Sequence, residues 1–232
     1  NLLVSDRGFR GVIIKLCKNF SDITVRDDEI VAKSGALLSA IASMALSESL
    51  AGFEFASGIP GTIGGAVLMN AGAYGGEMAG VVLETEYLNE DMEVRTLTEH
   101  EFSYRHSIFQ ENGGIITGVR IKLQKGERDK IKNLMEELNR KRRDKQPLTL
   151  PSAGSAFRRP AGGFAAKLID DAGLRGFKIG DAQVSEKHTG FIVNTGNATA
   201  EDVLRLLEAV KKKVYEEFGV WLTPEIKYLK ED

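Results

Sequence analysis

A glycine-rich segment at residues 52–80 constrains the fold more than any other part of the sequence. It holds 9 of the chain's 25 glycines in 29 residues and contains neither Lys nor Arg. A flexible linker is rich in Gly and Ser without large apolar residues, whereas here the glycines alternate with Phe53, Phe55, Ile59 and Ile63. We therefore expect an ordered, closely packed backbone at this segment.

Two interpretations of the glycine density remain open. Glycines let main-chain N–H groups approach a pyrophosphate or a flat ring that a Cβ would hold away. The same glycines are also typical of a tight packing corner without a ligand. The stretch "GIPGTIGG" has neither the Lys-Ser/Thr ending of a P-loop nor the G-x-G-x-x-G spacing that follows a strand, so it matches no familiar phosphate motif.

Composition narrows the class of protein. The 232 residues are 42% hydrophobic, enough for one large or two small domains, and the net charge of −2 gives no basic field for nucleic acid or anionic membranes. The single cysteine, Cys17, excludes an intramolecular disulfide framework, suits a reducing compartment, and is expected in the core. No signal peptide, spanning helix or metal-ligand cluster is present, so we expect a cytoplasmic protein without metal.

Hydrophobic spacing and turn residues predict a mixture of helices and strands. Helices are expected at residues 36–50, 128–147, 163–174 and 199–219, and a capping-box pattern predicts a short helix beginning at residues 98–101. Strands are expected at residues 10–16, 22–26, 30–35, 113–123, 190–194 and 220–229, with a hairpin over 81–98 that turns at 89–91. Because helices and strands do not alternate regularly, the class is α+β.

Ser155 lies between small residues in the stretch "TLPSAGSAFRRPAG". It lacks the G-x-S-x-G elbow, and no motif places a histidine as its base, so a hydrolase triad has weak support. A serine can also donate a proton when its neighbours tune it. The plain alternative is a turn or helix N-cap serine.

Charged side chains in three other motifs are further candidates. Arg105 in "SYRHSIF" is suited to binding a carboxylate or is a surface arginine. Glu225 follows Pro224 in the last expected strand and is either partly buried or solvated. The basic run at residues 139–147 is a solvated helix end or, since it leads to Ser155, Arg158 and Arg159, one wall of a pocket for a phosphorylated substrate.

The motifs occur in an order that resembles one enzyme family. They are "NLLVSDRGFRGVII", "GFEFASGIPGTIGGAVLMNAGAYGGE", "YRHSIF", "QPLTLPSAGSAFRRP", "KHTGFIVN" and "LTPEIKYL". The set is similar to the UDP-N-acetylenolpyruvoylglucosamine reductases. The resemblance implies an FAD-binding domain of the vanillyl-alcohol-oxidase/PCMH type at residues 1–125, followed by an α+β substrate-binding domain at 126–232.

The same resemblance implies the chemistry and the residues that perform it. The family reduces FAD with NADPH and passes the hydride to the enolpyruvyl double bond of a UDP-sugar in peptidoglycan synthesis. Ser155 matches the family's proton donor, and Arg105 and Glu225 match residues that hold the substrate carboxylate and stabilise an enol-like intermediate. Substrate contacts are implied for Tyr104, Arg159 and His188. Cofactor contacts are implied for Asn1, Leu2, Ser57, Gly58, Ile59, Pro60, Gly61, Thr62, Gly64, Gly65, Asn70, Ala71, Gly72, Gly75 and Gly118.

Departures from the family pattern set the remaining expectations. The chain lacks an inserted tyrosine-bearing loop, as in the shorter form of the family, and it begins inside the family's "GSNLL" motif, so an N-terminal subdomain is expected to be missing. A monomer is expected. The alternatives are another FAD oxidoreductase of the same superfamily and a nucleotide-sugar-binding remnant without flavin.

Overall fold

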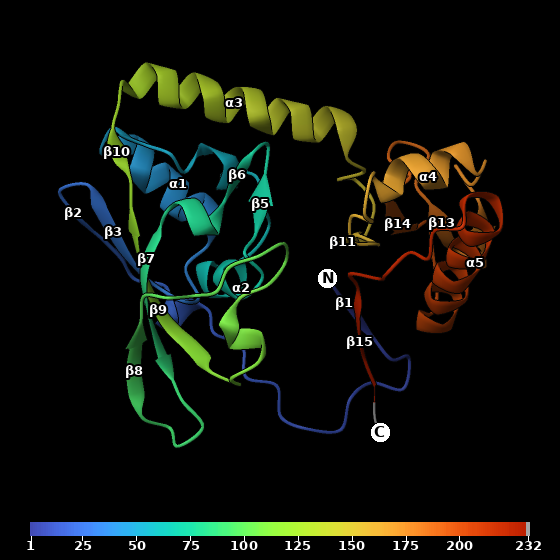
Figure 1. The fold of residues 1–232 in the computed structure, drawn as a ribbon, viewed down its shortest axis with the longest axis horizontal. Helices are drawn as coiled ribbons and strands as arrows, with labels where there is room; N and C mark the ends of the chain where they lie inside the picture. Colours follow the sequence, from blue (N-terminus) through green and yellow to red (C-terminus); the bar gives the residue numbers. More distant parts are fainter. Residues whose placement is uncertain (231–232) are drawn as a thin grey trace. The chain divides into compact units, whose positions relative to one another are not determined.

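The computed structural model describes residues 1–230 and divides into two compact units (Figure 1). One unit is formed by residues 14–142, and the other by Asn1–Ile13 together with the chain from Arg143 onward. The compact units divide after Ile13 and after Arg142. The boundary between family domains that we expect at 125/126 is a different division and stays a prediction.

A five-stranded antiparallel sheet forms the centre of the unit at residues 14–142. Its strand order is β2-β3-β9-β7-β8, with strands β2 (Ile23–Arg26), β3 (Glu29–Lys33), β7 (Val82–Leu88), β8 (Val94–Leu97) and β9 (Ile115–Lys122). In β3, Ile30 and Ala32 are buried while Val31 between them is exposed. This alternation gives the sheet one apolar face for helices to cover.

Two helices pack with this sheet. Helices α1 (Leu38–Ser47) and α2 (Ile63–Leu68) both contact β3, and α2 also contacts β9. Their fully buried residues include Leu38, Ile41, Ile63 and Val67. The glycine-rich segment supplies α2 and the short hairpin of β5 (Gly72–Ala73) and β6 (Gly76–Glu77), so it is part of the packed core.

Short elements complete this unit. They are the 3-10 turns η1 (Lys18–Phe20), η2 (Glu54–Ala56), η3 (Met78–Gly80) and η4 (Ile108–Gln110), and the pair β4 (Leu50–Ala51) with β10 (Gln124–Lys125). The long helix α3 (Arg128–Lys145) follows, and its residues up to Arg142 belong to this unit. Helix α3 is mostly polar and ends two residues before Pro147, as expected for a helix stopped by proline.

The second unit is built on an antiparallel four-stranded sheet. Its order is β11-β14-β13-β12, with strands β11 (Ser152–Ser155), β12 (Lys178–Ile179), β13 (Ala182–Val184) and β14 (Phe191–Asn194). Helices α4 (Ala165–Asp171) and α5 (Ala200–Phe218) contact each other and enclose a core that includes Ile169, Leu206 and Leu222. Strands β1 (Leu2–Val4) and β15 (Lys227–Leu229) form a separate parallel pair.

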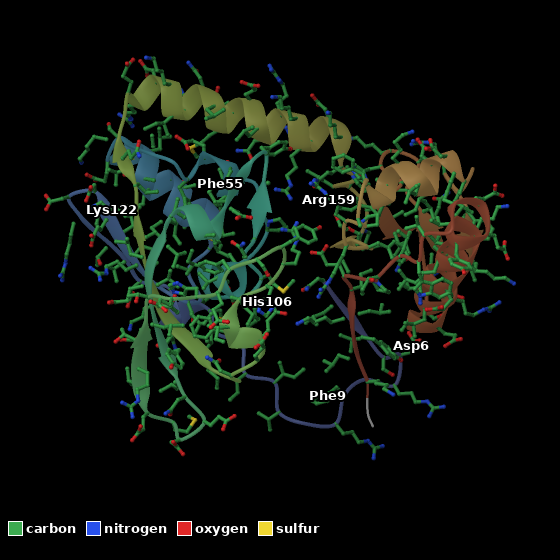
Figure 2. The ribbon with its side chains drawn as sticks, viewed as in Figure 1. Asp6, Phe9, Phe55, His106, Lys122 and Arg159 are labelled. Atoms are coloured by element: carbon green, nitrogen blue, oxygen red, sulfur yellow. The ribbon has the colours of Figure 1, made fainter. Side chains whose placement is uncertain are left out.

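Local signals at both ends define α5. Thr199 and Asp202 form a capping box at its start, and Gly219 ends it with a φ of 68°. Both carboxylate oxygens of Asp6, which is labelled in Figure 2, also accept a hydrogen bond from the backbone N–H of Ala200 at 2.9 Å. The start of the chain therefore stabilises a helix almost two hundred residues later.

Most expected elements are confirmed, and the α+β class with them. The helices at 36–50, 128–147, 163–174 and 199–219 and the hairpin over 81–98 occur with slightly shorter bounds. The closing strand is reduced to β15. None of the helices in the described part of the chain combines the length and the apolar character that a membrane span requires.

Three local expectations are wrong. Residues 10–16 form no strand, because no neighbouring strand in the described part of the chain pairs with them. Val12, Ile13 and Ile14 are therefore exposed. Cys17 follows it and is exposed rather than in the core. The capping-box pattern at residues 98–101 starts no helix, since Glu101 takes a left-handed φ of 49° that ends any helical turn there.

We predict that Asp6→Ala lowers the free energy of unfolding of the second unit by about 1 kcal/mol, because the first N–H of α5 loses its carboxylate partner near the positive end of the helix. Urea unfolding followed by far-UV circular dichroism measures the change. Asp91→Ala, in the exposed turn of the β7–β8 hairpin, is the control and should be neutral. Equal stability of both variants would contradict the cap.

His100 makes the stability of the other unit depend on pH. Its Nε2 lies 2.8 Å from the Thr85 hydroxyl, its ring stacks on Phe102 at 4.8 Å, and burial lowers its pKa below the ordinary value of 6.5. The unfolded chain then binds more protons than the native one below pH 6.5, so stability falls as the pH decreases.

We expect His100→Gln to reduce this loss of stability when the thermal midpoint is measured between pH 7.5 and 5.5. His106→Gln, at a half-buried histidine whose Nε2 lies 3.3 Å from a carboxylate oxygen of Glu111, is the control and should not reduce the loss. A pH dependence unchanged in His100→Gln would show that another group causes it.

Candidate active site

The glycine-rich segment combines close packing with open backbone. A Cβ added at Gly64 would lie 2.6 Å from the Cβ of Ser34, and one at Gly76 would lie 2.6 Å from the ring of Phe55, so both glycines serve packing. Added Cβ atoms at Gly61 and Gly75 would meet nothing within 4 Å. The segment therefore supports the packing interpretation at two positions and leaves room for a ligand at two others.

Two buried hydroxyls accompany these glycines. The Oγ atoms of Ser34 and Ser57 are shielded from solvent and make no hydrogen bond within the part of the chain that the structure describes. Buried polar atoms without partners are rare unless a bound group satisfies them. Together with the open backbone at Gly61 and Gly75, they fit a flat, phosphate-bearing cofactor such as FAD.

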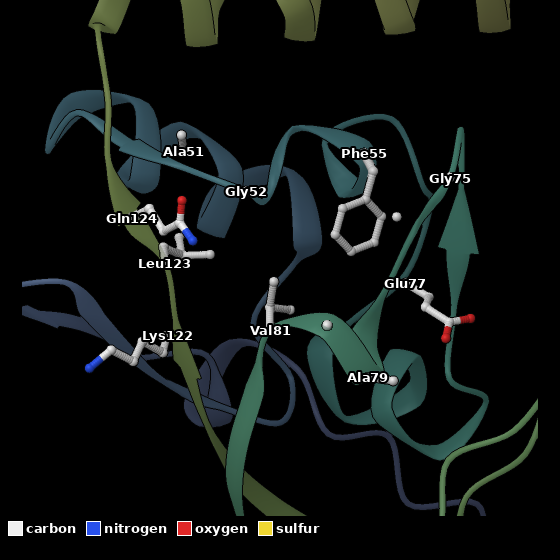
Figure 3. Close-up of a pocket in the computed structure, with 12 residues that line it drawn as sticks. Ala51, Gly52, Phe55, Gly75, Glu77, Ala79, Val81, Lys122, Leu123 and Gln124 are labelled. Carbon is white, nitrogen blue, oxygen red and sulfur yellow. The ribbon is translucent and has the colours of Figure 1, made fainter.

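A pocket of about 580 Å³ lies beside the β5–β6 hairpin. Figure 3 shows Phe55, Gly75 and Glu77 on one side of it and Leu123 and Gln124 on the other. Gly75, an expected cofactor contact, thus lines a real cavity. The remaining expected contacts from Ser57 to Thr62 form the loop between η2 and α2, and Asn70, Ala71 and Gly72 follow α2 directly.

Helix α3 brings a cation to this segment. A Cβ at Gly58 would lie 2.4 Å from Asn139 Oδ1 and 3.5 Å from Arg142 Nη1, so side chains of α3 lie directly over the backbone of Gly58. Burial lowers the pKa of Arg142, partly opposed by Tyr74, and the guanidinium remains charged at neutral pH. The glycine-rich segment has no cation in its own sequence, and α3 supplies one.

The basic run at 139–147 therefore serves two purposes. Lys141 forms an ion pair with Glu137 on the exposed side of α3, which agrees with the solvated interpretation. Arg142 faces Gly58 instead. Sequence reasoning did not single out Arg142, although the three-residue spacing from Asn139 places both on one side of a helix.

Arg105 and Tyr104 lie in the irregular segment between β8 and η4. Arg105 is half-buried, has a left-handed φ of 57°, and its guanidinium lies 5.2 Å from the centre of the Tyr104 ring. Tyr104 is 49% exposed. A charged and an aromatic side chain from adjacent residues are thus presented together at the surface of this unit.

In the second unit, the backbone next to Ser155 is paired with the backbone of Glu225. Ser155 ends β11 and is exposed, and the carbonyl of the next residue, Ala156, accepts a hydrogen bond from the N–H of Glu225 at 2.9 Å. Phe157 and Pro224 form an antiparallel bridge next to this bond. Ser155 is therefore a strand residue, and the helix N-cap alternative is wrong.

Two expected substrate contacts belong to this unit. His188 precedes β14, whose Phe191 pairs with Ser155, and its Nδ1 accepts a hydrogen bond from Gly190 N–H at 3.1 Å. Burial, with smaller effects of Arg175 and Lys145, lowers the pKa of His188. The guanidinium of Arg159, labelled in Figure 2, lies 4.3 Å from the ring centre of the exposed Phe164.

The outlying cofactor candidates are placed elsewhere. Asn1 and Leu2 belong to the second unit, where the carbonyl of Asn1 accepts from Lys227 N–H at 2.7 Å, two residues after Glu225. Gly118 lies in β9 and borders a cavity of about 520 Å³ with Glu86, which the structure keeps separate from the pocket at Gly75.

Comparisons with known proteins cover both units. Residues 1–98 match the family model of an FAD binding domain, and residues 146–229 match the C-terminal domain of UDP-N-acetylenolpyruvoylglucosamine reductase. The reductase of Caldanaerobacter subterraneus subsp. tengcongensis is 55% identical over the whole chain, which spans 77% of that protein. That of Clostridioides difficile is 49% identical with the same coverage.

A solved structure agrees with these matches. The crystal structure of UDP-N-acetylenolpyruvylglucosamine reductase from Thermus caldophilus superposes with a TM-score of 0.85 at 38% identity, over 99% of this chain and 82% of that one. From sequence and structure alike, the chain belongs to the UDP-N-acetylenolpyruvoylglucosamine reductase family.

Proposed function

We propose that this chain reduces UDP-N-acetylglucosamine enolpyruvate to UDP-N-acetylmuramate, with Ser155, Arg105 and Glu225 as the side chains that act on the substrate. Family membership makes the chain an FAD-dependent oxidoreductase of peptidoglycan precursor synthesis, and thereby of cell shape and division. The observation that carries the site is the hydrogen bond from Glu225 N–H to the carbonyl of Ala156, next to Ser155.

The glycine-rich segment holds the cofactor in this proposal. The unpartnered hydroxyls of Ser34 and Ser57 and the open backbone at Gly61 and Gly75 support it. A bound FAD would supply the hydride chemistry of the reaction, with NADPH as the source of the hydride and the enolpyruvyl double bond as its acceptor. The side chains of this protein then have to bind the substrate, orient it and supply one proton to the carbon of the double bond that does not receive the hydride.

Ser155 is suited to supply that proton. Its hydroxyl is exposed at the end of β11, and its neighbours Gly154 and Ala156 present little side-chain bulk to an approaching substrate. The left-handed φ of 81° at Gly154 is a conformation that favours glycine, so the small residue before Ser155 is required by the backbone itself. Ser155 acts as a general acid rather than as a nucleophile.

Arg105 and Glu225 act on the substrate carboxylate. A guanidinium forms charge-assisted hydrogen bonds with a carboxylate, and negative charge that develops on an enolate oxygen is stabilised by a fixed cation or acid. Glu225 is half-buried beside the strand that carries Ser155, which favours a fixed position for its side chain. Tyr104, Arg159 and His188 are proposed to contact the rest of the UDP-sugar.

The finer expectations about partners are part of the proposal. The chain acts on a small UDP-sugar. We further propose that it is a monomer in the cytoplasm, with neither nucleic acid nor membrane as partner. A flavin absorption spectrum distinguishes the family's reaction from the alternative of a nucleotide-sugar-binding remnant, which would be colourless.

Ser155→Ala should leave reduction of the flavin by NADPH unchanged and slow reduction of the enolpyruvyl substrate by about 10²- to 10⁴-fold, because only the second step needs the proton. Stopped-flow absorbance of the flavin band measures the two half-reactions separately.

Ser152→Ala removes the other hydroxyl of β11 and should keep both rates. If Ser155→Ala turned over the enolpyruvyl substrate as fast as the unsubstituted protein, Ser155 would not be the proton donor. A colourless, inactive protein in every variant would instead reject the flavin chemistry itself.

A further inference from the structure

The main chain at Arg105 adopts a conformation that is unfavourable without supporting contacts. Its φ of 57° lies in the left-handed region, which is unfavourable for a side chain of this size. Tyr104 and Arg105 are the central residues of a four-residue turn closed by two hydrogen bonds, Ser103 N–H to His106 O at 3.3 Å and the reverse bond at 3.1 Å. Such a turn persists only where surrounding contacts stabilise it.

The side-chain amide of Gln110 supplies one such contact. Its Nε2 donates to the carbonyl of Arg105 at 3.0 Å and to the carbonyl of Leu68 at 2.9 Å. A primary amide has two N–H donors, and these two carbonyls engage both. Gln110 therefore ties the backbone of Arg105 to the last residue of α2.

Asn70 makes a second connection. It is 1% exposed, its Nδ2 donates to the carbonyl of Ser103 at 3.0 Å, and its Oδ1 accepts from Ala79 N–H at 2.9 Å. Ser103 is the first residue of the turn that contains Arg105. Ser103 is thus attached to Asn70, and Arg105 is connected through Gln110 to Leu68. Both Asn70 and Leu68 lie at the end of α2 within the glycine-rich segment.

Ser107 strengthens the same attachment. It is fully buried, and its hydroxyl donates to the carbonyl of Leu68 at 2.9 Å, the atom that also accepts from Gln110. A carbonyl oxygen has two lone pairs, so both bonds form together. The Arg105 turn and the cofactor segment therefore share one rigid connection within this unit.

We propose that Gln110 is a positioning residue for Arg105, supported by Asn70, and that it sets where the guanidinium lies relative to the glycine-rich segment. This inference rests on the role proposed above for Arg105. Without the Gln110 amide, the main chain at Arg105 is free to leave the left-handed conformation. The Cα from which the guanidinium extends then no longer has a fixed position. Because a misplacement of about 1 Å costs roughly 10²-fold in rate, a bond to the Arg105 carbonyl has a catalytic consequence.

The test compares Gln110→Met with Gln183→Met in the full, flavin-loaded protein. Methionine keeps the length and removes the amide donors. Gln183 is the matched control, because its Nε2 also donates to a backbone carbonyl, that of Gly176 at 3.0 Å, in the other unit. We expect Gln110→Met to lower kcat for the enolpyruvyl substrate about 10- to 100-fold, with the KM for NADPH and the rate of flavin reduction unchanged.

Amide hydrogen exchange supplies a readout that does not depend on turnover. The segment around residues 101–108 should exchange faster in Gln110→Met than in Gln183→Met, because the turn has lost its attachment to Leu68. An unchanged exchange pattern would overturn the proposed clamp.

A double-mutant cycle with Arg105→Ala separates this inference from the proposed function. If Gln110 acts through Arg105, Arg105→Ala with Gln110→Met is no slower than Arg105→Ala alone. Independent, additive losses, or a normal kcat in Gln110→Met beside a slow Arg105→Ala, would overturn the positioning role. A normal kcat in Arg105→Ala would reject the role proposed for Arg105 and the positioning role with it.

Discussion

The close approach of Gly64 to Ser34 is the contact on which the unit at residues 14–142 depends. The N–H of Gly64 donates to the carbonyl of Ser34 at 2.9 Å, and no Cβ fits between them. This contact fixes the start of α2 beside β3. The end of α2 then presents the Leu68 carbonyl, to which Ser107 and Gln110 donate, and Gln110 also donates to the carbonyl of Arg105.

The second unit uses the backbone in a similar way. One backbone hydrogen bond joins Glu225 to Ala156, the residue after Ser155, although Ser155 and Glu225 are 70 residues apart in the chain. The β1–β15 pair and the Asp6 cap on α5 add long-range connections to the same region. In the first unit, side-chain donors bind backbone carbonyls around Arg105, and in the second a backbone bond connects Glu225 with the residue after Ser155. Both are supporting hydrogen bonds of the kind that hold a functional side chain in place.

Much of the fold could be predicted where the signal is local. Helix α5 has a capping box, an apolar stripe and a terminal glycine, and the β7–β8 hairpin has a polar turn between alternating strands, so neighbouring residues contain the required information. Residues 10–16 have equally strong β propensity and form no strand. Propensity describes a residue's preference, whereas a strand also needs a partner whose position depends on the whole chain.

The sequence by itself determined the family, the α+β class, and the identity of Ser155, Arg105 and Glu225 as candidates, because these depend on residue types and their order. Only the tertiary structure decided that Arg142 faces Gly58, that Gln110 holds the Arg105 carbonyl, and that Cys17 is exposed. The physical reason is that hydrogen bonding and burial depend on which atoms meet in space. These contacts form between residues whose spacing in the sequence follows no helix or strand period, so the sequence pattern does not predict them.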